Sequence, residues 1–194
     1  MVPPAKGEDS MSDKPMHFDT MQVHAGTAPD PATGARQVPI YQSTAFVFKD
    51  ADHAARLFNL QEVGYVYSRL TNPTVGALAN RIVALEGGQG GWCCSSGHAA
   101  QIMALYPLME PGRNIVASTR LYGGTVTQFT QVFRKFGWST KWVDIDDEAA
   151  IRAAIDDDTR AIFCESISNP GGHITDLPMV ARVANAAGIP LVVD

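Results

Sequence analysis

The feature that most constrains the fold is a regular alternation of strand and helix patterns over the second half of the chain. Short apolar runs predict strands at 91–95, 114–118, 139–144, 161–165 and 191–194. Segments with helical spacing alternate with them, at 72–86, 98–108, 125–136, 147–155 and 176–188. This alternation predicts an α/β fold with a mostly parallel sheet and helices on both faces. Ligands of such sheets bind at the carboxyl ends of the strands, so we expect functional residues in the loops that follow strands.

The first third of the chain lacks this regularity. Residues 1–15 lack the apolar core of a signal peptide and are expected to be a disordered tail. Residues 16–62 are rich in Gly, Pro and Thr with one short predicted helix at 50–60, which is typical of an arm that contacts another chain. Residues 63–194 carry the sheet pattern and end in a strand, so we expect the chain to be the front part of a longer protein.

Composition excludes several classes of function. The 194 residues carry a net charge of −5, which gives no electrostatic reason to expect nucleic acid or an anionic membrane as a partner. No apolar run is long enough to span a bilayer. The three cysteines form no CxxC motif and the five histidines are scattered, so we expect no disulfide framework and no metal site. A reducing cytoplasm is the simplest compartment.

The turn before the helix 98–108 is a candidate anion site. Ser96, Gly97 and His98 follow two cysteines and a serine, and these mostly small residues allow a sharp turn from strand to helix. The first N–H groups of a helix have no internal partner and carry partial positive charge, so a phosphate fits there. The alternative is an ordinary strand-to-helix turn. The nearby Gly87–Gly91 run is not a dinucleotide fingerprint, because it follows a helix and precedes a strand.

Four further residues stand where a ligand would meet them. Tyr67 and Arg69 share one face of an extended segment, and an arginine binds phosphate in a fork geometry. Tyr122 follows the strand 114–118, where its ring could stack on a ligand and its hydroxyl could move a proton. Asn169 follows the strand 161–165 and is held extended by the next proline.

Asp194 closes the last strand, where a carboxylate could pair with a protonated ring nitrogen. Each candidate alone is also compatible with a plain turn or a solvated edge. Together they describe one flat aromatic ligand with a phosphate at one end and a basic nitrogen at the other, which is pyridoxal phosphate.

Five motifs, in the same order, resemble the Cys/Met-metabolism family of pyridoxal-phosphate enzymes. They are Tyr-Ser-Arg-Leu-Thr-Asn-Pro-Thr at 67–74, Ser-Ser-Gly-His at 95–98, Leu-Tyr-Gly-Gly-Thr at 121–125, Glu-Ser-Ile-Ser-Asn-Pro at 165–170 and Leu-Val-Val-Asp at 191–194. The resemblance implies the type I, aspartate aminotransferase-like fold, of which this chain covers the front part. It also implies a homo-oligomer, a dimer or a dimer of dimers, with residues 16–62 embracing the partner.

The resemblance also implies roles at the cofactor. Gly97 and His98, after Ser96, would offer backbone N–H groups to the phosphate. Tyr67 and Arg69 would reach the phosphate bound in the neighbouring subunit, so that each site is shared.

At the other end of the cofactor, Tyr122 would stack on the ring and assist proton transfer. Asn169 would lie beside the ring hydroxyl, and Asp194 would pair with the pyridine nitrogen.

Within the family, the segments 20–26 and 38–44 resemble the O-acetylhomoserine sulfhydrylase branch of methionine biosynthesis and trans-sulfuration. The implied reaction is γ-replacement on O-acetylhomoserine by sulfide or methanethiol, giving homocysteine or methionine. Cystathionine γ-synthase and O-succinylhomoserine sulfhydrylase are alternatives, and a non-catalytic α/β ligand-binding or interaction module is an alternative of another class. Gly124 stands where the family's methionine γ-lyases carry Cys, and His98 replaces a usual small or amide residue.

Two groups that the family's chemistry needs are expected beyond Asp194. The Schiff-base lysine would follow the strand-end aspartate by about twenty residues, roughly one helix–strand unit. The arginine for the substrate carboxylate would lie further on. Lys141 is no substitute, because it stands within a strand pattern with no small-residue turn. The chain is therefore expected to be inactive by itself.

Overall fold

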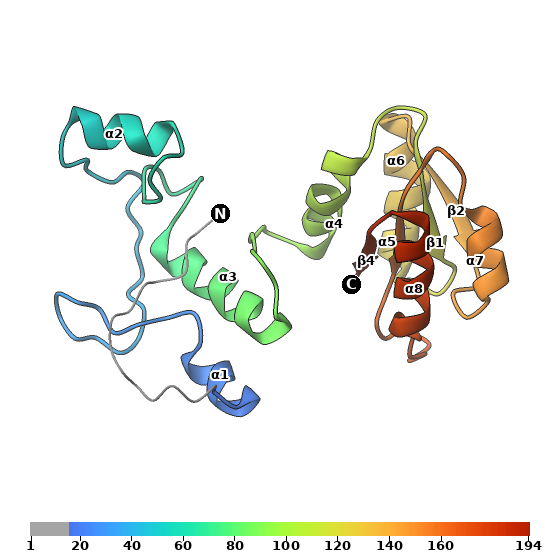
Figure 1. The fold of residues 1–194 in the computed structure, drawn as a ribbon, viewed down its shortest axis with the longest axis horizontal. Helices are drawn as coiled ribbons and strands as arrows, with labels where there is room; N and C mark the ends of the chain where they lie inside the picture. The colour runs from blue at the N-terminus through green and yellow to red at the C-terminus, as the bar shows by residue number, and fades with distance from the viewer. Residues whose placement is uncertain (1–15) are drawn as a thin grey trace. The chain divides into compact units, whose positions relative to one another are not determined.

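The computed structural model describes residues 16–194, and the predicted tail at 1–15 lies outside the described residues. The described chain divides into two compact units, residues 16–93 and residues 94–194 (Figure 1). The second unit holds the whole sheet. Its strands are β1 (Asn114–Ser118), β2 (Ser139–Val143), β3 (Thr159–Cys164) and β4 (Leu191–Val193).

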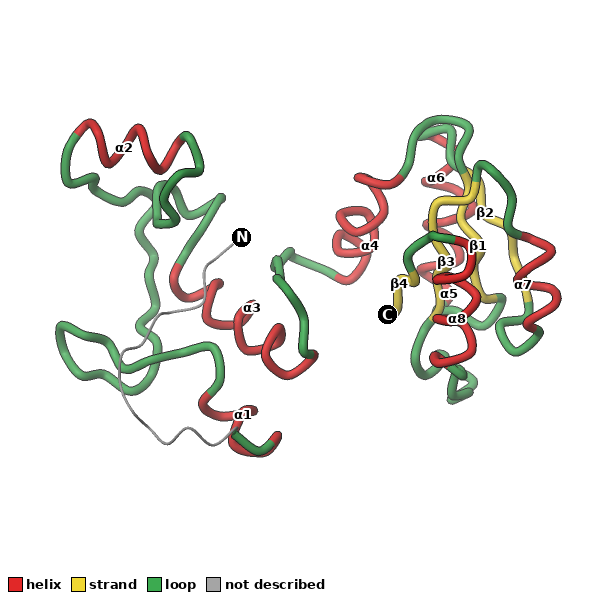
Figure 2. The backbone as a smooth tube through the Cα atoms, in the orientation of Figure 1, coloured by secondary structure: helices red, strands yellow, loops and turns green. Residues whose placement is uncertain are grey.

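All pairings in this sheet are parallel, and the strand order is β2-β1-β3-β4 (Figure 2). Four of the five strands predicted from the sequence are thus confirmed, each within two residues of its expected bounds. Parallel pairing brings the carboxyl ends of all four strands to one edge of the sheet.

Helices cover both faces of the sheet, as predicted. Side chains of β1 alternate, so that Ile115 and Ala117 face one core cluster with Leu105, Phe129 and Phe133, while Val116 faces another. The second cluster holds buried side chains of two later helices, Ile151, Met179, Val180, Val183 and Ala184. The helices of this unit are α4 (Gly97–Leu105), α5 (Gly123–Thr127), α6 (Phe133–Lys135), α7 (Glu148–Ala154) and α8 (Leu177–Ala187), with the 3₁₀ turn η1 (Tyr106–Leu108) and the π-helical segment η2 (Gln128–Val132).

Side-chain caps fix where these helices begin. The side chains of Ser96, Asp147 and Asp176 accept hydrogen bonds from the N–H groups of Ala99, Ala150 and Met179, each three residues on. Gly188 ends α8 in the left-handed conformation with φ of 69°. Asp176 and Gly188 thus mark the two ends of α8 by their own local chemistry.

One predicted strand is wrong. Residues 91–95 form no strand, although their sequence is apolar and bounded by glycines. A strand needs a neighbour to pair with its backbone groups, and within residues 16–194 this segment has none. Instead it lies against α3 (Pro73–Glu86): a Cβ on Gly91 would come within 2.9 Å of Val83 Cγ2, and the Cys93 thiol lies 3.9 Å from the Val75 carbonyl oxygen.

The helix predicted at 125–136 is present as the continuous run α5–η2–α6, but of its apolar residues Phe129, Val132, Phe133 and Phe136 only two are buried. Phe129 and Phe133 are buried and stack with ring centroids 4.5 Å apart. Val132 and Phe136 are 36% and 41% exposed. The π-helical turn at 128–132 changes the angular spacing of side chains, so the regular 3.6-residue pattern does not carry through it.

The first unit contains α1 (Phe18–His24), α2 (Ala51–Phe58) and α3. Gly26, with φ of 74°, lets the chain after α1 pass against α3, because a Cβ there would collide with the backbone of Asn80 and Arg81. The Arg81 Nε donates to the Ala25 carbonyl 3.0 Å away and completes this contact.

Residues 16–62 bury few side chains. Only Ala25 and Leu57 in this range are buried, whereas apolar side chains such as Ile40, Val47 and Leu60 are largely exposed. The predicted helix at 50–60 is present as α2, capped by Asp50. Between residues 16 and 194 no helix combines the length and the apolar character needed to cross a membrane.

Asn72 supplies a prediction about the stability of the first unit. Its Oδ1 caps α3 by accepting from the Thr74 N–H at 2.9 Å, and its Nδ2 donates to the Tyr41 carbonyl and the Ser68 hydroxyl at 2.9 and 3.0 Å. We expect Asn72→Ala to lower the free energy of unfolding by about 2–3 kcal/mol, measured by denaturant titration. The control is Asp176→Ala, which removes an exposed cap alone and should cost about 1 kcal/mol. Equal losses for the two variants would contradict the prediction.

Candidate functional site

Three predicted site residues lie at the carboxyl edge of the sheet. Tyr122 lies in the loop between β1 and α5, Asn169 lies in the turn after β3, and Asp194 directly follows β4. Because the strands are parallel, the chain reaches the same edge at each of these points. The sheet therefore brings together residues that are up to 72 positions apart in the sequence, from Tyr122 to Asp194.

The predicted anion turn forms the start of α4. Ser96 is extended and caps the helix through the Ala99 N–H, at 3.2 Å. The N–H groups of Gly97 and His98 have no acceptor among residues 16–194. The His98 carbonyl is held by the Gln128 side chain, whose Nε2 donates at 3.1 Å. A helix start of this kind offers two free N–H donors to an anion.

The His98 side chain packs against Tyr122. Their rings stack with centroids 6.1 Å apart and planes 30° apart. Gly124 makes room for the pair, since a Cβ on it would collide with the Tyr122 ring and lie 2.9 Å from His98 Cε1. Half of the Tyr122 surface remains exposed, at 50%. The phenol thus lies at the surface of the second unit beside the start of α4.

Two polar residues that the sequence analysis did not single out tie this edge together. Glu165, at the end of β3, accepts from the Tyr122 N–H at 2.6 Å and from the Asn169 N–H at 3.0 Å. The sequence feature that could have indicated Glu165 is a charged residue directly after an apolar strand.

Gln101 is the second such residue, a buried amide on α4. Its Nε2 donates to Asp194 Oδ2 at 2.9 Å and to Thr125 Oγ1 at 3.0 Å. Its Oε1 is buried and has no hydrogen-bond partner in the described chain. The sequence feature that could have indicated Gln101 is a polar residue inside a mostly apolar helix.

An ion-pair network lies next to the Tyr122 loop. Arg120 contacts Asp144 at 3.2 Å and Asp146 at 2.5 Å, and His173 Nε2 lies 3.0 Å from Asp146. Partial burial opposes ionisation, but hydrogen bonds from Arg120 and His173 outweigh it and lower the pKa of Asp146 below its ordinary value. The network connects the loops that follow β1 and β2 with the turn that follows β3.

Cys164 is at this end of β3 but is not a reactive group. It is fully buried in the second core cluster, and burial, together with the nearby Glu165 charge, raises the pKa of its thiol to about 11. The thiolate is the nucleophilic form of cysteine, so this thiol is inert at neutral pH. Among residues 16–194 no group of His, Cys, Asp and Glu side chains is arranged to hold a metal ion.

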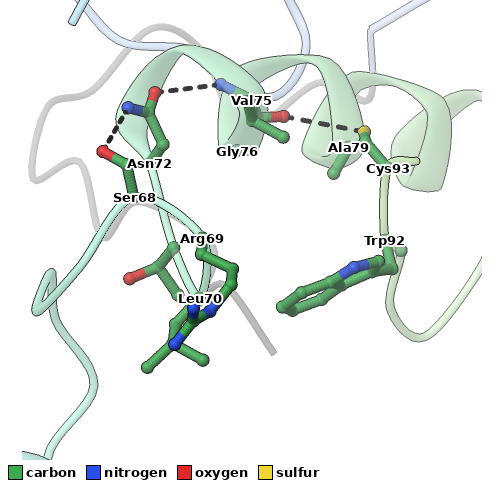
Figure 3. A pocket seen from close by; sticks show the side chains of 11 residues that line it. Ser68, Arg69, Leu70, Asn72, Val75, Gly76, Ala79, Trp92 and Cys93 are labelled. Carbon is green, nitrogen blue, oxygen red and sulfur yellow. Dashed lines mark hydrogen bonds between the residues drawn. The ribbon is translucent and has the colours of Figure 1, made fainter. Parts of the chain in front are cut away.

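Tyr67 and Arg69 lie in the first unit. The Arg69 guanidinium lies over the Tyr67 ring, 5.2 Å from its centroid, and both side chains are exposed. Arg69 also lines a cavity of about 160 Å³ under α3, with Trp92 on another wall (Figure 3). Backbone bonds from Phe46 to Val66 and from Ser68 to Thr44 hold the segment extended up to the turn at Ser68.

One known protein family matches nearly the whole of the described chain. The family, described as Cys/Met metabolism PLP-dependent enzyme, matches residues 19–194. The chain belongs to this family.

Relatives in the family are close. A homocysteine synthase of Schizosaccharomyces pombe is 49% identical over 92% of this chain and 42% of its own length. An O-acetyl-L-homoserine sulfhydrylase of Leptospira meyeri is 46% identical over 91% of this chain and 40% of its own length. The chain therefore spans about two fifths of the length of these relatives.

A solved structure agrees in fold. A Campylobacter jejuni protein assigned as an O-acetylhomoserine (thiol)-lyase superposes with a TM-score of 0.89 at 39% identity, over 93% of this chain and 44% of its own. That structure contains N'-pyridoxyl-lysine-5'-monophosphate. The α/β fold and the pyridoxal-phosphate family expected from the sequence are thus confirmed.

The side chain of Lys141 makes a structural contact. Its Nζ donates to the Ala154 carbonyl at 2.9 Å, at the end of α7, and pairs with Asp156 at 2.5 Å. The ammonium group is therefore engaged in a structural contact. Together with Asn114 and Thr159, Lys141 lowers the pKa of Asp156 well below its ordinary value.

Gly124 gives a prediction about the ring pair. We expect Gly124→Ala to displace the rings of His98 and Tyr122, because these ring atoms are what a Cβ would meet. The free energy of unfolding should change by less than about 1 kcal/mol, since ring ends can move without moving the backbone. NMR of the His98 ring protons, which the stacked Tyr122 ring shifts, measures the displacement.

The matched control for the ring pair is the neighbouring glycine. A Cβ on Gly123 would meet nothing within 4 Å, so Gly123→Ala should leave the His98 ring signals in place. Identical spectra for the two variants would show that Gly124 does not set the ring geometry.

Thiol labelling tests the state of Cys164. With a pKa of about 11, about one Cys164 thiol in a thousand is ionised at pH 8, and burial blocks access as well. We expect a thiol reagent at pH 8 to modify the exposed Cys94 in the native protein and Cys164 only after unfolding. Peptide mass mapping reads both sites. Native labelling of Cys164 at the rate of Cys94 would contradict the assignment.

Proposed function

We propose that the protein carrying this chain catalyses γ-replacement on O-acetylhomoserine, with sulfide or methanethiol as the nucleophile and homocysteine or methionine as the product. Support comes from relatives at 46–49% identity that are named homocysteine synthase and O-acetyl-L-homoserine sulfhydrylase. The observation that carries the proposal is the set of polar groups gathered at the carboxyl edge of the sheet, from Tyr122 to Asp194.

These groups suit pyridoxal phosphate. The free N–H groups of Gly97 and His98 at the start of α4, next to Ser96, fit a phosphate. Asp194 offers a carboxylate that Gln101 orients through a 2.9 Å hydrogen bond, as a basic ring nitrogen requires. When bound, the cofactor supplies an electron-withdrawing ring that stabilises negative charge developing on the substrate amino acid.

The chain's own residues have distinct proposed roles. Asp194 keeps a proton on the ring nitrogen, because its negative charge favours the protonated form. Tyr122 lies against the ring and moves a proton through its hydroxyl. The stacked His98 ring limits how far the Tyr122 ring can turn. Asn169 donates toward the ring hydroxyl through its side-chain amide.

Assembly is part of the proposal. Tyr67 and Arg69 would bind the phosphate held by a neighbouring subunit, and residues 16–62 would be the arm that contacts that subunit. The exposed guanidinium of Arg69 and the many exposed apolar side chains of residues 16–62 support this view. A homo-oligomer, dimer or dimer of dimers, with shared sites is the proposed state. The free cysteines at 93, 94 and 164 support a reducing cytoplasm as its compartment.

A visible spectrum with borohydride reduction tests the cofactor assignment. We expect the purified full-length protein, which extends beyond Asp194, to show a yellow band that borohydride bleaches, with the cofactor mass then retained on the polypeptide. Intact mass before and after reduction measures it. A protein that stays colourless when pyridoxal phosphate is added would contradict the catalytic proposal and favour a non-catalytic binding module.

Substrate competition then separates the catalytic alternatives. Product formation from O-acetylhomoserine with sulfide or methanethiol is expected to exceed that with cysteine, which a cystathionine γ-synthase would use. O-succinylhomoserine in place of O-acetylhomoserine tests the acyl group. Preference for cysteine or for the succinyl ester would replace the proposed reaction by the corresponding alternative.

A further inference from the structure

Glu165 is a buried carboxylate whose two oxygens both bind main-chain N–H groups. The residue is 6% exposed. Oε1 accepts from the Tyr122 N–H at 2.6 Å, and Oε2 accepts from the Asn169 N–H at 3.0 Å. The first donor lies in the loop after β1 and the second in the turn after β3. One side chain therefore fixes the backbone of two loops that come from different strands.

This carboxylate has no cationic partner among residues 16–194. Burying an unpaired carboxylate is costly unless hydrogen bonds compensate for the lost water. The compensation here comes from the two N–H groups, and hydrogen bonds to a charged acceptor are stronger than those to a neutral one. The two hydrogen bonds that stabilise the buried Glu165 carboxylate therefore also hold the main chain at Tyr122 and Asn169.

We propose that Glu165 is a positioning residue that fixes the Tyr122 ring and the Asn169 side-chain amide at a set position relative to each other. This inference rests on the proposed function, in which both residues contact the same cofactor, Tyr122 by stacking on its ring and Asn169 by hydrogen bonding to its ring hydroxyl. Glu165 itself touches neither substrate nor cofactor in the proposed site. It acts through the two main-chain N–H groups.

The residue type follows from the donors. Both partners are N–H groups, so the side chain must supply two acceptors in one plane. A glutamine supplies one acceptor and would place its NH₂ group against the other N–H donor. An aspartate keeps both acceptors but is one methylene shorter, so it cannot reach both donors with the same geometry.

The test compares Glu165→Gln with a matched control in the same place. The control is Thr175→Val, because Thr175 is also buried and its hydroxyl donates to the Glu165 main-chain oxygen at 2.7 Å, with no hydrogen bond to Tyr122 or Asn169. Both variants remove a buried hydrogen bond at Glu165. Only the first removes the bridge between the two loops.

Amide hydrogen exchange of the cofactor-free protein is the first readout. Glu165→Gln should speed exchange at Tyr122 and Asn169 together, by about tenfold or more, because the two N–H groups share the bridge that is lost. Thr175→Val should leave both amides protected. Unchanged exchange at Tyr122 and Asn169 in Glu165→Gln would overturn the inference.

The second readout is kinetic and spectroscopic, in the complete holoenzyme. Glu165→Gln should lower kcat for γ-replacement by about 10- to 100-fold, because a misplacement of about 1 Å can cost about 100-fold. It should also alter the absorbance band of the bound cofactor. Glu165→Asp should recover part of both, and Thr175→Val should lower the melting temperature without changing either.

The outcomes separate this inference from the proposed function. If Glu165→Gln and Thr175→Val lose kcat equally and in step with their melting temperatures, Glu165 is structural and the inference fails. If the wild-type protein shows no γ-replacement while Glu165→Gln still loosens both amides, the proposed function fails and the hold of Glu165 on the two loops stands.

Discussion

Parallel pairing of β1 with β2 and β3, and of β3 with β4, is the constraint on which the rest of the second unit depends. It sends every strand toward the same edge, so the loops that follow β1 and β3 start at the same edge as Asp194, which follows β4. The pairing also leaves two faces of alternating apolar side chains, which α4 to α6 cover on one side and α7 and α8 on the other. The candidate site depends on this sheet, because Tyr122, Asn169 and Asp194 come from separate segments that the sheet brings to one edge.

Side-chain acceptors for backbone N–H groups then give the loops their shape. Ser96 holds the start of α4, and Glu165 holds the loop of Tyr122 to the turn of Asn169. Gln101 instead donates a hydrogen bond from its side-chain amide to the Asp194 carboxylate. In each case one polar side chain satisfies a backbone or carboxylate group that has no partner in regular secondary structure. Order in the loops therefore comes from a few polar contacts, and order in the sheet comes from apolar packing.

Much of this could be predicted from the sequence because the signals were local. Caps such as Asp176, and glycines such as Gly188, mark helix ends by their own chemistry, and apolar runs mark buried strands. The strand expected at 91–95 failed because strand formation depends on a partner that a local pattern cannot show. Glu165 and Gln101 were missed for a related reason: their importance comes from contacts with residues 43 and 93 positions away.

The space at Gly124 has an evolutionary consequence. The rings of His98 and Tyr122 fill the volume that a side chain at position 124 would need, so positions 98 and 124 are not free to vary independently. A larger residue at 124 needs both rings to shift, and a smaller residue at 98 would leave more room for that shift. Substitutions at 98 and 124 are therefore expected to be non-additive in their effect on the position of the Tyr122 ring.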